Sequence, residues 1–210
     1  MRALIMAGGE GTRLGMGEKP LVRIAGRPMI SWVIDAYTKA GVNPIVVTSD
    51  KTPYTKNWCR ANDITFVSTE GEGYLEDLIS AVLILEEDGP FFTSVSDIPC
   101  LRSETICAVW NAYTASGLDA CSTWVPISLC RKFGTDPRYQ LEIDGIPASP
   151  AGINILHGLK LNGEQEELRL LLHEQGLVFN VNTRSELTIL EAHFQSLMTR
   201  HPPMSPPSDE

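Results

Sequence analysis

The chain begins with a short apolar run that leads directly into a glycine-rich segment. The run Leu4-Ile5-Met6 has the length and composition of a buried strand, and five glycines follow between Ala7 and Gly17. Glycine tolerates positive φ angles and close approach to a ligand, and successive free N–H groups form a nest for anions. Arg13 and Lys19 add two cations to the same segment. The pattern predicts a phosphate-binding loop after the first strand.

A flexible glycine turn with solvated charges is the alternative interpretation, and two common nucleotide motifs do not fit this loop. No Gly-Lys-Ser or Gly-Lys-Thr follows the glycines, which excludes a Walker A loop. The dinucleotide motif GxGxxG matches only at Gly9 and Gly11, because Leu14 stands where the third glycine belongs. If the loop binds phosphates, it belongs to another class.

Short apolar runs alternate with amphipathic segments along most of the chain. The predicted strands cover residues 4–6, 45–47, 64–67, 91–95, 121–125 and 177–179. The predicted helices cover residues 29–39, 53–61, 105–113 and 166–172, a stripe of Leu75, Leu78, Ile79, Val82 and Leu83, and a last helix after a Thr183/Glu186 capping box. This alternation predicts an α/β fold, a three-layer sandwich with a mainly parallel, Rossmann-like sheet. Such sheets bind ligands at the carboxyl ends of their strands.

Composition and charge narrow the class of protein. The 210 residues are 43% hydrophobic, which favours one domain with a full core; we assign it to 1–198 and expect a disordered Pro- and Ser-rich tail at 199–210. A net charge of -9 argues against a nucleic-acid partner. Five scattered cysteines without a CxxC pair argue against zinc and disulfides and favour a cytoplasmic protein. No segment has the apolar length of a membrane span.

The glycine loop resembles the signature of the GT-A-like nucleotidyltransferases. The matching residues are Gly8-Gly9-x-Gly11-Thr12-Arg13-Leu14, followed by Glu18-Lys19-Pro20-Leu21. The resemblance implies that the loop wraps a nucleotide, with Arg13 at the β and γ phosphates and Lys19 at the α phosphate. The nucleotide-binding residues that it implies in this loop are Ala7, Gly8, Gly9, Gly11, Thr12, Arg13 and Lys19.

Two positions outside the loop are candidate metal ligands. Asp97 follows the predicted strand at 91–95, where a carboxylate is well placed to hold Mg²⁺, although an Asp near Pro99 also marks turns. The resemblance implies that Asp97 holds the metal and that Asn182, before the last helix, is a second ligand. The alternative for Asn182 is a cap or turn at that helix. Arg13, Lys19 and Asp97 are then the implied catalytic residues.

Two further segments narrow the resemblance. The segments Gly71-Glu72-Gly73-Tyr74-Leu75-Glu76-Asp77-Leu78 and Pro150-Ala151-Gly152-Ile153-Asn154, with the short length, are similar to the archaeal GTP:adenosylcobinamide-phosphate guanylyltransferases. That resemblance implies GTP and adenosylcobinamide phosphate as substrates, in the nucleotide-loop assembly stage of cobalamin biosynthesis. Gly73 and Asp77 become candidate nucleotide contacts and Gly152 a candidate acceptor contact. Asp77 is equally explained as a first-turn acid favoured by the helix dipole.

Three other functions remain open from the sequence. A molybdenum-cofactor guanylyltransferase or a sugar-phosphate nucleotidyltransferase would share the loop but differ in the acceptor. A non-catalytic nucleotide-binding module would not need Arg13, Lys19 and Asp97 together. No Ser-His or Cys-His set indicates a protein nucleophile, which agrees with direct transfer between phosphates.

Overall fold

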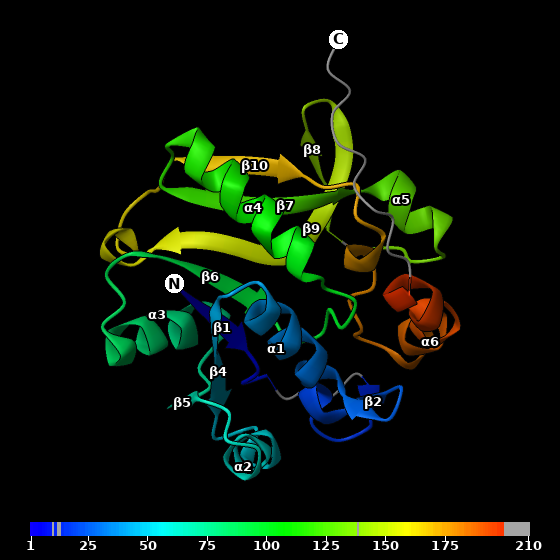
Figure 1. Cartoon of the computed structure of the whole chain (residues 1–210), viewed down its shortest axis with the longest axis horizontal. Coiled ribbons are helices and arrows are strands. Elements are labelled where there is room, and N and C mark those ends of the chain that lie inside the picture. Colours follow the sequence, from blue (N-terminus) through cyan, green and yellow to red (C-terminus); the bar gives the residue numbers. More distant parts are fainter. Residues whose placement is uncertain (10, 12–13, 138, 200–210) are drawn as a thin grey trace.

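A twisted, mostly parallel sheet runs through the molecule (Figure 1). The computed structural model of the chain describes residues 1–9, 11, 14–137 and 139–199. The strands of the main sheet are β1 (Arg2–Met6), β4 (Asn43–Ser49), β5 (Phe66–Thr69), β6 (Pro90–Val95), β7 (Ala120–Pro126), β8 (Leu141–Ile143), β9 (Ile146–His157) and β10 (Glu167–Leu171). Within the described residues, the strand order is β10-β7-β9-β6-β1-β4-β5, with β8 paired to β9. A separate hairpin joins β2 (Arg23–Ile24) and β3 (Arg27–Pro28).

Strand β9 is the one departure from parallel pairing along this order. β1 pairs in parallel with β4 and β6, β4 with β5, and β7 with β10, whereas β9 runs antiparallel to both β6 and β7. β8 leads into β9 through a two-residue turn, Asp144 and Gly145, both with positive φ. Asp-Gly is a common pair in such tight hairpins, because both positions require positive φ. The hairpin returns the chain antiparallel into the middle of the sheet.

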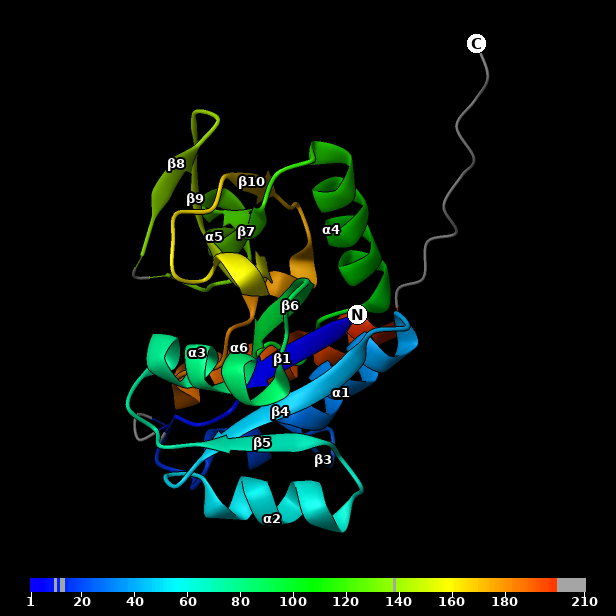
Figure 2. The same cartoon turned by 90° about the vertical axis from the view of Figure 1, so that its left-hand side faces the viewer.

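Helices cover both faces of this sheet, as the alternating pattern predicts. They are α1 (Met29–Lys39), α2 (Pro53–Ala61), α3 (Tyr74–Leu85), α4 (Ser103–Ser116), α5 (Ile127–Lys132) and α6 (Arg184–Thr199). Figure 2 shows α3 on one side of the sheet and α1 and α4 on the other. Leu78 and Val82 of α3 pack in one buried cluster with Leu4 and Phe91 of the sheet. The predicted α/β three-layer sandwich is therefore confirmed.

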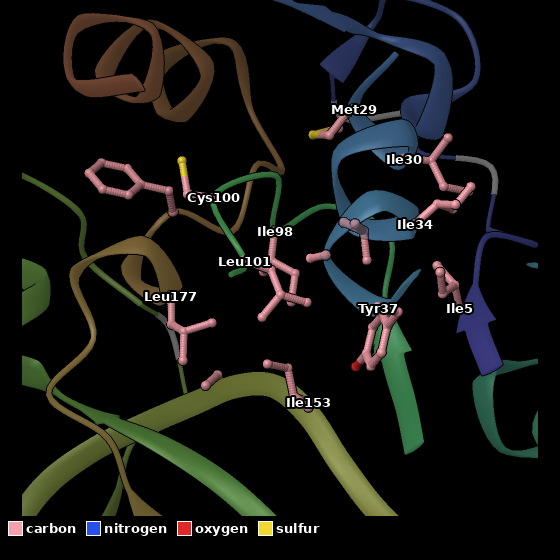
Figure 3. Close-up of a cluster of buried hydrophobic side chains, with 14 of the residues drawn as sticks. Ile5, Met29, Ile30, Ile34, Tyr37, Ile98, Cys100, Leu101, Ile153 and Leu177 are labelled. Carbon is pink, nitrogen blue, oxygen red and sulfur yellow. The ribbon is translucent and has the colours of Figure 1, made fainter. Parts of the chain in front are cut away.

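The larger core anchors the segment that follows β6. Figure 3 shows Ile98 and Leu101 beside Tyr37 of α1, with Ile5 of β1 and Ile153 of β9 in the same cluster. Ile98 is fully buried and Leu101 nearly so. Burying a side chain of this size stabilises a fold by about 1.5–3 kcal/mol relative to leaving it exposed. The buried side chains of Ile98 and Leu101 therefore fix the backbone next to Asp97.

Two predicted elements are wrong in type. The predicted helix at 166–172 is strand β10, which pairs with β7. Leu168 and Leu170 are less exposed than Glu167 and Arg169. This alternation with a period of two residues is that of a strand with one covered face. The predicted strand at 177–179 is mostly a 3-10 helix, Gln175–Val178. An apolar run this short has no intrinsic preference, and its packing partners decide its conformation.

The predicted stripe on α3 is only partly buried. Leu78 and Val82 are buried, whereas Leu75 and Leu83 are 59% and 71% exposed. The buried residues of α3 are Asp77, Leu78, Ala81 and Val82, so the sheet covers only one edge of the predicted stripe. The predictions for 29–39, 53–61 and the capping box are confirmed: the Glu186 N–H donates to Thr183 Oγ1 at 3.2 Å at the start of α6.

The last helix, α6, ends at Thr199, one residue beyond the predicted boundary at 198, and the assignment of 1–198 to a single domain stays a prediction. The rest of the predicted tail lies outside the described residues. Among the helices that the structure describes, none has both the length and the apolar composition needed to span a bilayer.

Candidate active site

A cavity of about 500 Å³ lies at the carboxyl ends of the parallel strands. It is lined by the loop after β1, by residues that follow β4 and β5, and by the end of β6. Eight of the predicted site residues line it: Ala7, Gly8, Gly9, Gly11, Lys19, Gly73, Asp77 and Asp97. The carboxyl ends of parallel strands meet at one edge, which is why segments distant in sequence converge here. The predicted Thr12 and Arg13 lie outside the described residues.

The glycine loop folds back on the lysine that ends it. Gly11 has φ +59°, and a Cβ there would lie 2.6 Å from the Cβ of Lys19. Only glycine accommodates both this conformation and this contact. The hydroxyl of Ser49 donates to the Gly8 carbonyl at 2.7 Å, and so ties the loop to β4. The loop is thus shaped around Lys19.

Arg184 and Glu18 hold the far part of the loop. The Arg184 guanidinium donates from Nε to the Leu14 carbonyl and from Nη2 to the Gly15 carbonyl, both at 3.2 Å. The two Glu18 carboxylate oxygens accept from the N–H groups of residues 54 and 55, at 2.8 and 2.6 Å, in the first turn of α2. A carboxylate satisfies free N–H groups at a helix N-terminus and favours the helix dipole. Lys19 is therefore anchored through its neighbour.

Lys19 joins the two predicted metal ligands. Its Nζ donates to Asn182 Oδ1 at 2.8 Å and forms an ion pair with Asp97 Oδ2. The Val181 N–H donates to the Asp97 carbonyl at 3.0 Å, which brings the segment before α6 against the end of β6. Asn182 Nδ2 also donates to Asn180 Oδ1 at 2.7 Å. Asn182 therefore faces the ammonium of the phosphate loop in addition to preceding the helix cap.

Only one of the two carboxylate oxygens of Asp97, Oδ2, pairs with Lys19. Burial raises the pKa of Asp97, and the neighbouring Lys19 ammonium opposes that rise. Its Oδ1 is buried and has no hydrogen-bond partner among the residues that the structure describes. A buried oxygen acceptor beside a phosphate-binding loop suits a divalent cation. In the described part of the chain, no three His, Cys, Asp or Glu side chains are placed so that they could together hold a metal ion, so the fit rests on Asp97 with an amide oxygen.

Asp77 bonds within its own loop and also borders the cavity. It lies in the first turn of α3, and its Oδ1 accepts from the Gly71 N–H at 2.9 Å. Its Oδ2 points toward the phosphate loop, since a Cβ on Gly8 would lie 3.4 Å away from it. Gly73, which precedes α3, lines the same cavity. Asp77 therefore shapes the 71–73 loop and borders the cavity.

Gly152 has a packing reason for being glycine. It lies in β9 with φ +82°, and a Cβ there would lie 2.6 Å from Val95 Cγ2. Among the described residues, the lining of the cavity of about 500 Å³ includes Val95 but not Gly152. Gly152 allows β9 to approach the end of β6. Its assignment to acceptor binding stays a prediction.

Sequence reasoning missed Lys51. This lysine lines the cavity, and its backbone N–H donates to Ser49 Oγ at 3.1 Å. It follows β4, whose carboxyl end lies beside that of β1 in a parallel pair. The sequence could have indicated Lys51, because a lysine that closely follows the strand parallel to β1 is expected at the same edge of the sheet as the glycine loop.

The chain is similar in sequence to known nucleotidyltransferases. Residues 3–129 match the MobA-like NTP transferase domain family. The chain is 33% identical over 202 residues to adenosylcobinamide-phosphate guanylyltransferase of Methanocaldococcus jannaschii, covering 91% of this chain and 96% of that protein. It is 38% identical over 115 residues to mannose-1-phosphate guanyltransferase of Saccharomyces cerevisiae, but there it spans only 31% of the relative's length.

Solved structures share the fold at low identity. Molybdopterin-guanine dinucleotide biosynthesis protein A from Archaeoglobus fulgidus superposes with a TM-score of 0.66 at 17% identity, over 93% of this chain and 100% of that one. A CMP:2-keto-3-deoxy-manno-octonic acid synthetase gives 0.70 at 16% identity, over 93% and 98%. These comparisons confirm the resemblance read from the glycine loop, and the chain belongs to the family of MobA-like NTP transferase domains.

Proposed function

We propose that the chain transfers GMP from GTP to adenosylcobinamide phosphate, giving adenosylcobinamide-GDP and pyrophosphate in cobalamin biosynthesis. The observation that carries this proposal is the likeness to adenosylcobinamide-phosphate guanylyltransferase, which extends over 91% of the chain. It includes the C-terminal part that holds Asn182, whereas the family match ends at residue 129. The contact of Lys19 with Asp97 and Asn182 supports it, because it joins both parts at one cavity.

The reaction needs position and charge more than acid-base chemistry. An oxygen of the acceptor phosphate attacks the α phosphorus of GTP in line; a P–O bond forms there, and the bond to the β phosphate breaks to release pyrophosphate. A phosphate monoester is largely ionised at neutral pH because its second pKa is about 6. Lys19 would stabilise the charge that grows on the α phosphate. Arg13 and the loop N–H groups would hold the leaving pyrophosphate.

Asp97 and Asn182 are the residues that would hold Mg²⁺. The unpartnered Oδ1 of Asp97 supports this assignment. The cation would supply charge neutralisation for the nucleotide phosphates. Lys19 contacts both of these side chains, Asn182 through its Oδ1 and Asp97 through its carboxylate.

The nucleoside would occupy the part of the cavity bordered by Gly73 and Asp77. We infer guanine as the base because the two relatives are guanylyltransferases. We place the reaction in the cytoplasm, because all five cysteines are free thiols.

A molybdopterin guanylyltransferase is the second candidate. The family description and the fold of the Archaeoglobus fulgidus protein favour it. The sugar-phosphate enzymes match only about half of this chain. The three enzyme classes share the nucleotide chemistry and differ in the acceptor. A non-catalytic module is disfavoured, since binding alone would not require a buried Lys19–Asp97 pair.

The test is pyrophosphate release by the full chain with GTP, Mg²⁺ and adenosylcobinamide phosphate. We expect release that requires all three and that ATP, CTP and UTP do not replace GTP. Chelation of the metal should abolish it. Pyrophosphate release only with molybdopterin or mannose 1-phosphate would show that the proposed acceptor is wrong. A failure to bind any nucleotide would show that the proposed nucleotide site is wrong.

A further inference from the structure

The cavity of about 500 Å³ has two lysines in its described lining, and they follow different strands. Lys19 ends the glycine loop after β1, whereas Lys51 follows β4. The strand order is β6-β1-β4-β5, so Lys51 lies on the side of β1 that is away from Asp97, which follows β6. Neighbouring strands lie about 4.8 Å apart, which separates the ends of β6 and β4 by roughly 10 Å. The two lysines therefore serve different parts of a bound nucleotide.

The backbone places Lys51 beside the segment that follows β5. Ser49 pairs with Thr69 at the end of the two strands, so Lys51 and Gly71 each lie two residues beyond that pair. A Cβ on Gly71 would lie 3.3 Å from Lys51 Cδ, which shows that the Lys51 side chain runs against Gly71. Glu72, the next residue, lines the same cavity. A cation and a carboxylate from two neighbouring loops thus border one end of the cavity.

This end of the cavity does not suit a phosphate. Besides Lys51, it carries the carboxylates of Glu72 and of Asp77, which holds the Gly71 N–H. Carboxylates repel a phosphate group. Among the residues that the structure describes, neither the Lys51 ammonium nor the Glu72 carboxylate has an ion-pair or hydrogen-bond partner. A free cation close to a free carboxylate suits a neutral group that presents hydrogen-bond acceptors next to donors.

We propose that Lys51 and Glu72 select the base of the nucleotide: the Lys51 ammonium donates to O6 and N7 of guanine, and the Glu72 carboxylate accepts from its N1–H and N2–H groups. This inference rests on the nucleotide site of the proposed function and names the residues that choose its base. Lysine donating to O6 and N7 is a recurrent guanine contact in DNA recognition. Adenine has an amino group in place of O6 and no hydrogen on N1. With adenine, donor would therefore face donor at Lys51, and acceptor would face acceptor at Glu72.

The test measures the Kd of the full chain for GTP, ATP and ITP in the presence of Mg²⁺. Lys51→Met should raise the Kd for GTP and for ITP, which both carry O6, by about tenfold to a hundredfold. The Kd for ATP should stay within about twofold of the wild-type value. Lys51→Arg keeps hydrogen-bond donors and should retain the preference for GTP over ATP. The matched control is Lys132→Met, at an exposed position of α5 outside the described lining, which should change none of the three constants.

Glu72 is tested with the same ligands. ITP differs from GTP only in lacking the N2 amino group, so the wild type should bind GTP about threefold to tenfold more tightly than ITP. Glu72→Gln, which keeps the size but removes the charge, should lose most of this preference. Glu70→Gln, at an exposed position outside the described lining, is the matched control and should keep it.

The outcomes separate the base contacts from other roles. Equal losses of GTP and ATP binding in a folded Lys51→Met protein would place Lys51 at the phosphates and overturn its role at the base. If Lys51→Met does not fold, Glu72→Gln decides: an unchanged preference for GTP over ITP would overturn the proposal. A wild type that binds ATP as tightly as GTP would overturn it as well. A wild type that prefers GTP but releases no pyrophosphate with adenosylcobinamide phosphate would overturn the proposed function, whereas loss of that preference in Lys51→Met would still uphold the base contacts.

Discussion

The Nζ of Lys19 donates to Oδ1 of Asn182 at 2.8 Å, although the two residues are 163 positions apart. Lys19 belongs to the glycine loop after the first strand, and Asn182 precedes the last helix. Asp97 shares the same ammonium. This contact joins the part of the chain that matches the family, residues 3–129, to the part beyond it. The site therefore needs both parts in one fold.

Removing the shared ammonium should stop catalysis. Lys19→Ala removes the cation expected at the α phosphate, and we expect kcat to fall by about a hundredfold or more, by analogy with loss of one oxyanion donor. Lys19→Arg keeps the positive charge on a guanidinium of different shape, and its kcat should lie between those of the wild type and of Lys19→Ala. Steady-state pyrophosphate release measures both. Near-normal turnover of Lys19→Ala would remove Lys19 from the mechanism.

The same change should alter how stability depends on pH. Burial raises the pKa of Asp97, and Lys19 opposes that rise. In Lys19→Met the pKa of Asp97 should rise further, because the opposing charge is gone. An acid whose pKa is raised by folding favours the folded state below its unfolded pKa, and that contribution is lost as pH rises through its folded pKa. Urea unfolding should show the destabilisation of Lys19→Met growing from acidic to neutral pH; equal destabilisation throughout would contradict this.

Glu18 should act through helix α2. Its carboxylate accepts from the N–H groups of Tyr54 and Thr55 in the first turn of that helix. Glu18→Ala should lower the free energy of unfolding by about 1 kcal/mol, as for loss of a helix cap, and raise the KM for GTP because Lys19 loses its anchor. Glu142→Ala, at an exposed position of β8, is the control. Unchanged stability and KM in Glu18→Ala would show that the anchor is dispensable.

Gly152 should matter for packing. Gly152→Ala combines a positive φ with a clash against Val95, and we expect a loss of about 1–3 kcal/mol in the free energy of unfolding. Gly134→Ala has a similar φ of +77° and no atom within 4 Å of the added Cβ, so it measures the backbone strain alone. The double variant Gly152→Ala/Val95→Ala should recover part of the loss. Equal losses at both glycines would exclude the clash.

Four of the five thiols should be unreactive in the native protein. Burial raises the pKa of Cys59 and Cys121 to about 11 and that of Cys100 to about 12, and it raises the pKa of Cys130 as well. A thiol below its pKa is protonated and a poor nucleophile. Alkylation at about pH 8 should label exposed Cys107 alone, and denaturant should release all five. Rapid native labelling of a second cysteine would contradict the burial.

Local sequence predicted the elements whose signals are strong over short range. Helix α1 and helix α2 have the predicted bounds, and α6 follows the predicted Thr183/Glu186 capping box. The glycine loop indicated the family, because its glycines and Lys19 must be adjacent along the chain to wrap one phosphate group. Such features depend on neighbours in sequence, so the sequence alone determines them.

Tertiary structure decided what depends on partners distant along the chain. Segment 166–172 is a strand because β7 pairs with it, and only one side of α3 is buried because a single sheet face meets it. Asn182 meets Lys19 because the Val181 N–H donates to the Asp97 carbonyl, which holds the segment before α6 against the end of β6. A sequence pattern gives each segment a tendency of a few tenths to about 1 kcal/mol per residue, whereas pairing and burial contribute more and select the final arrangement.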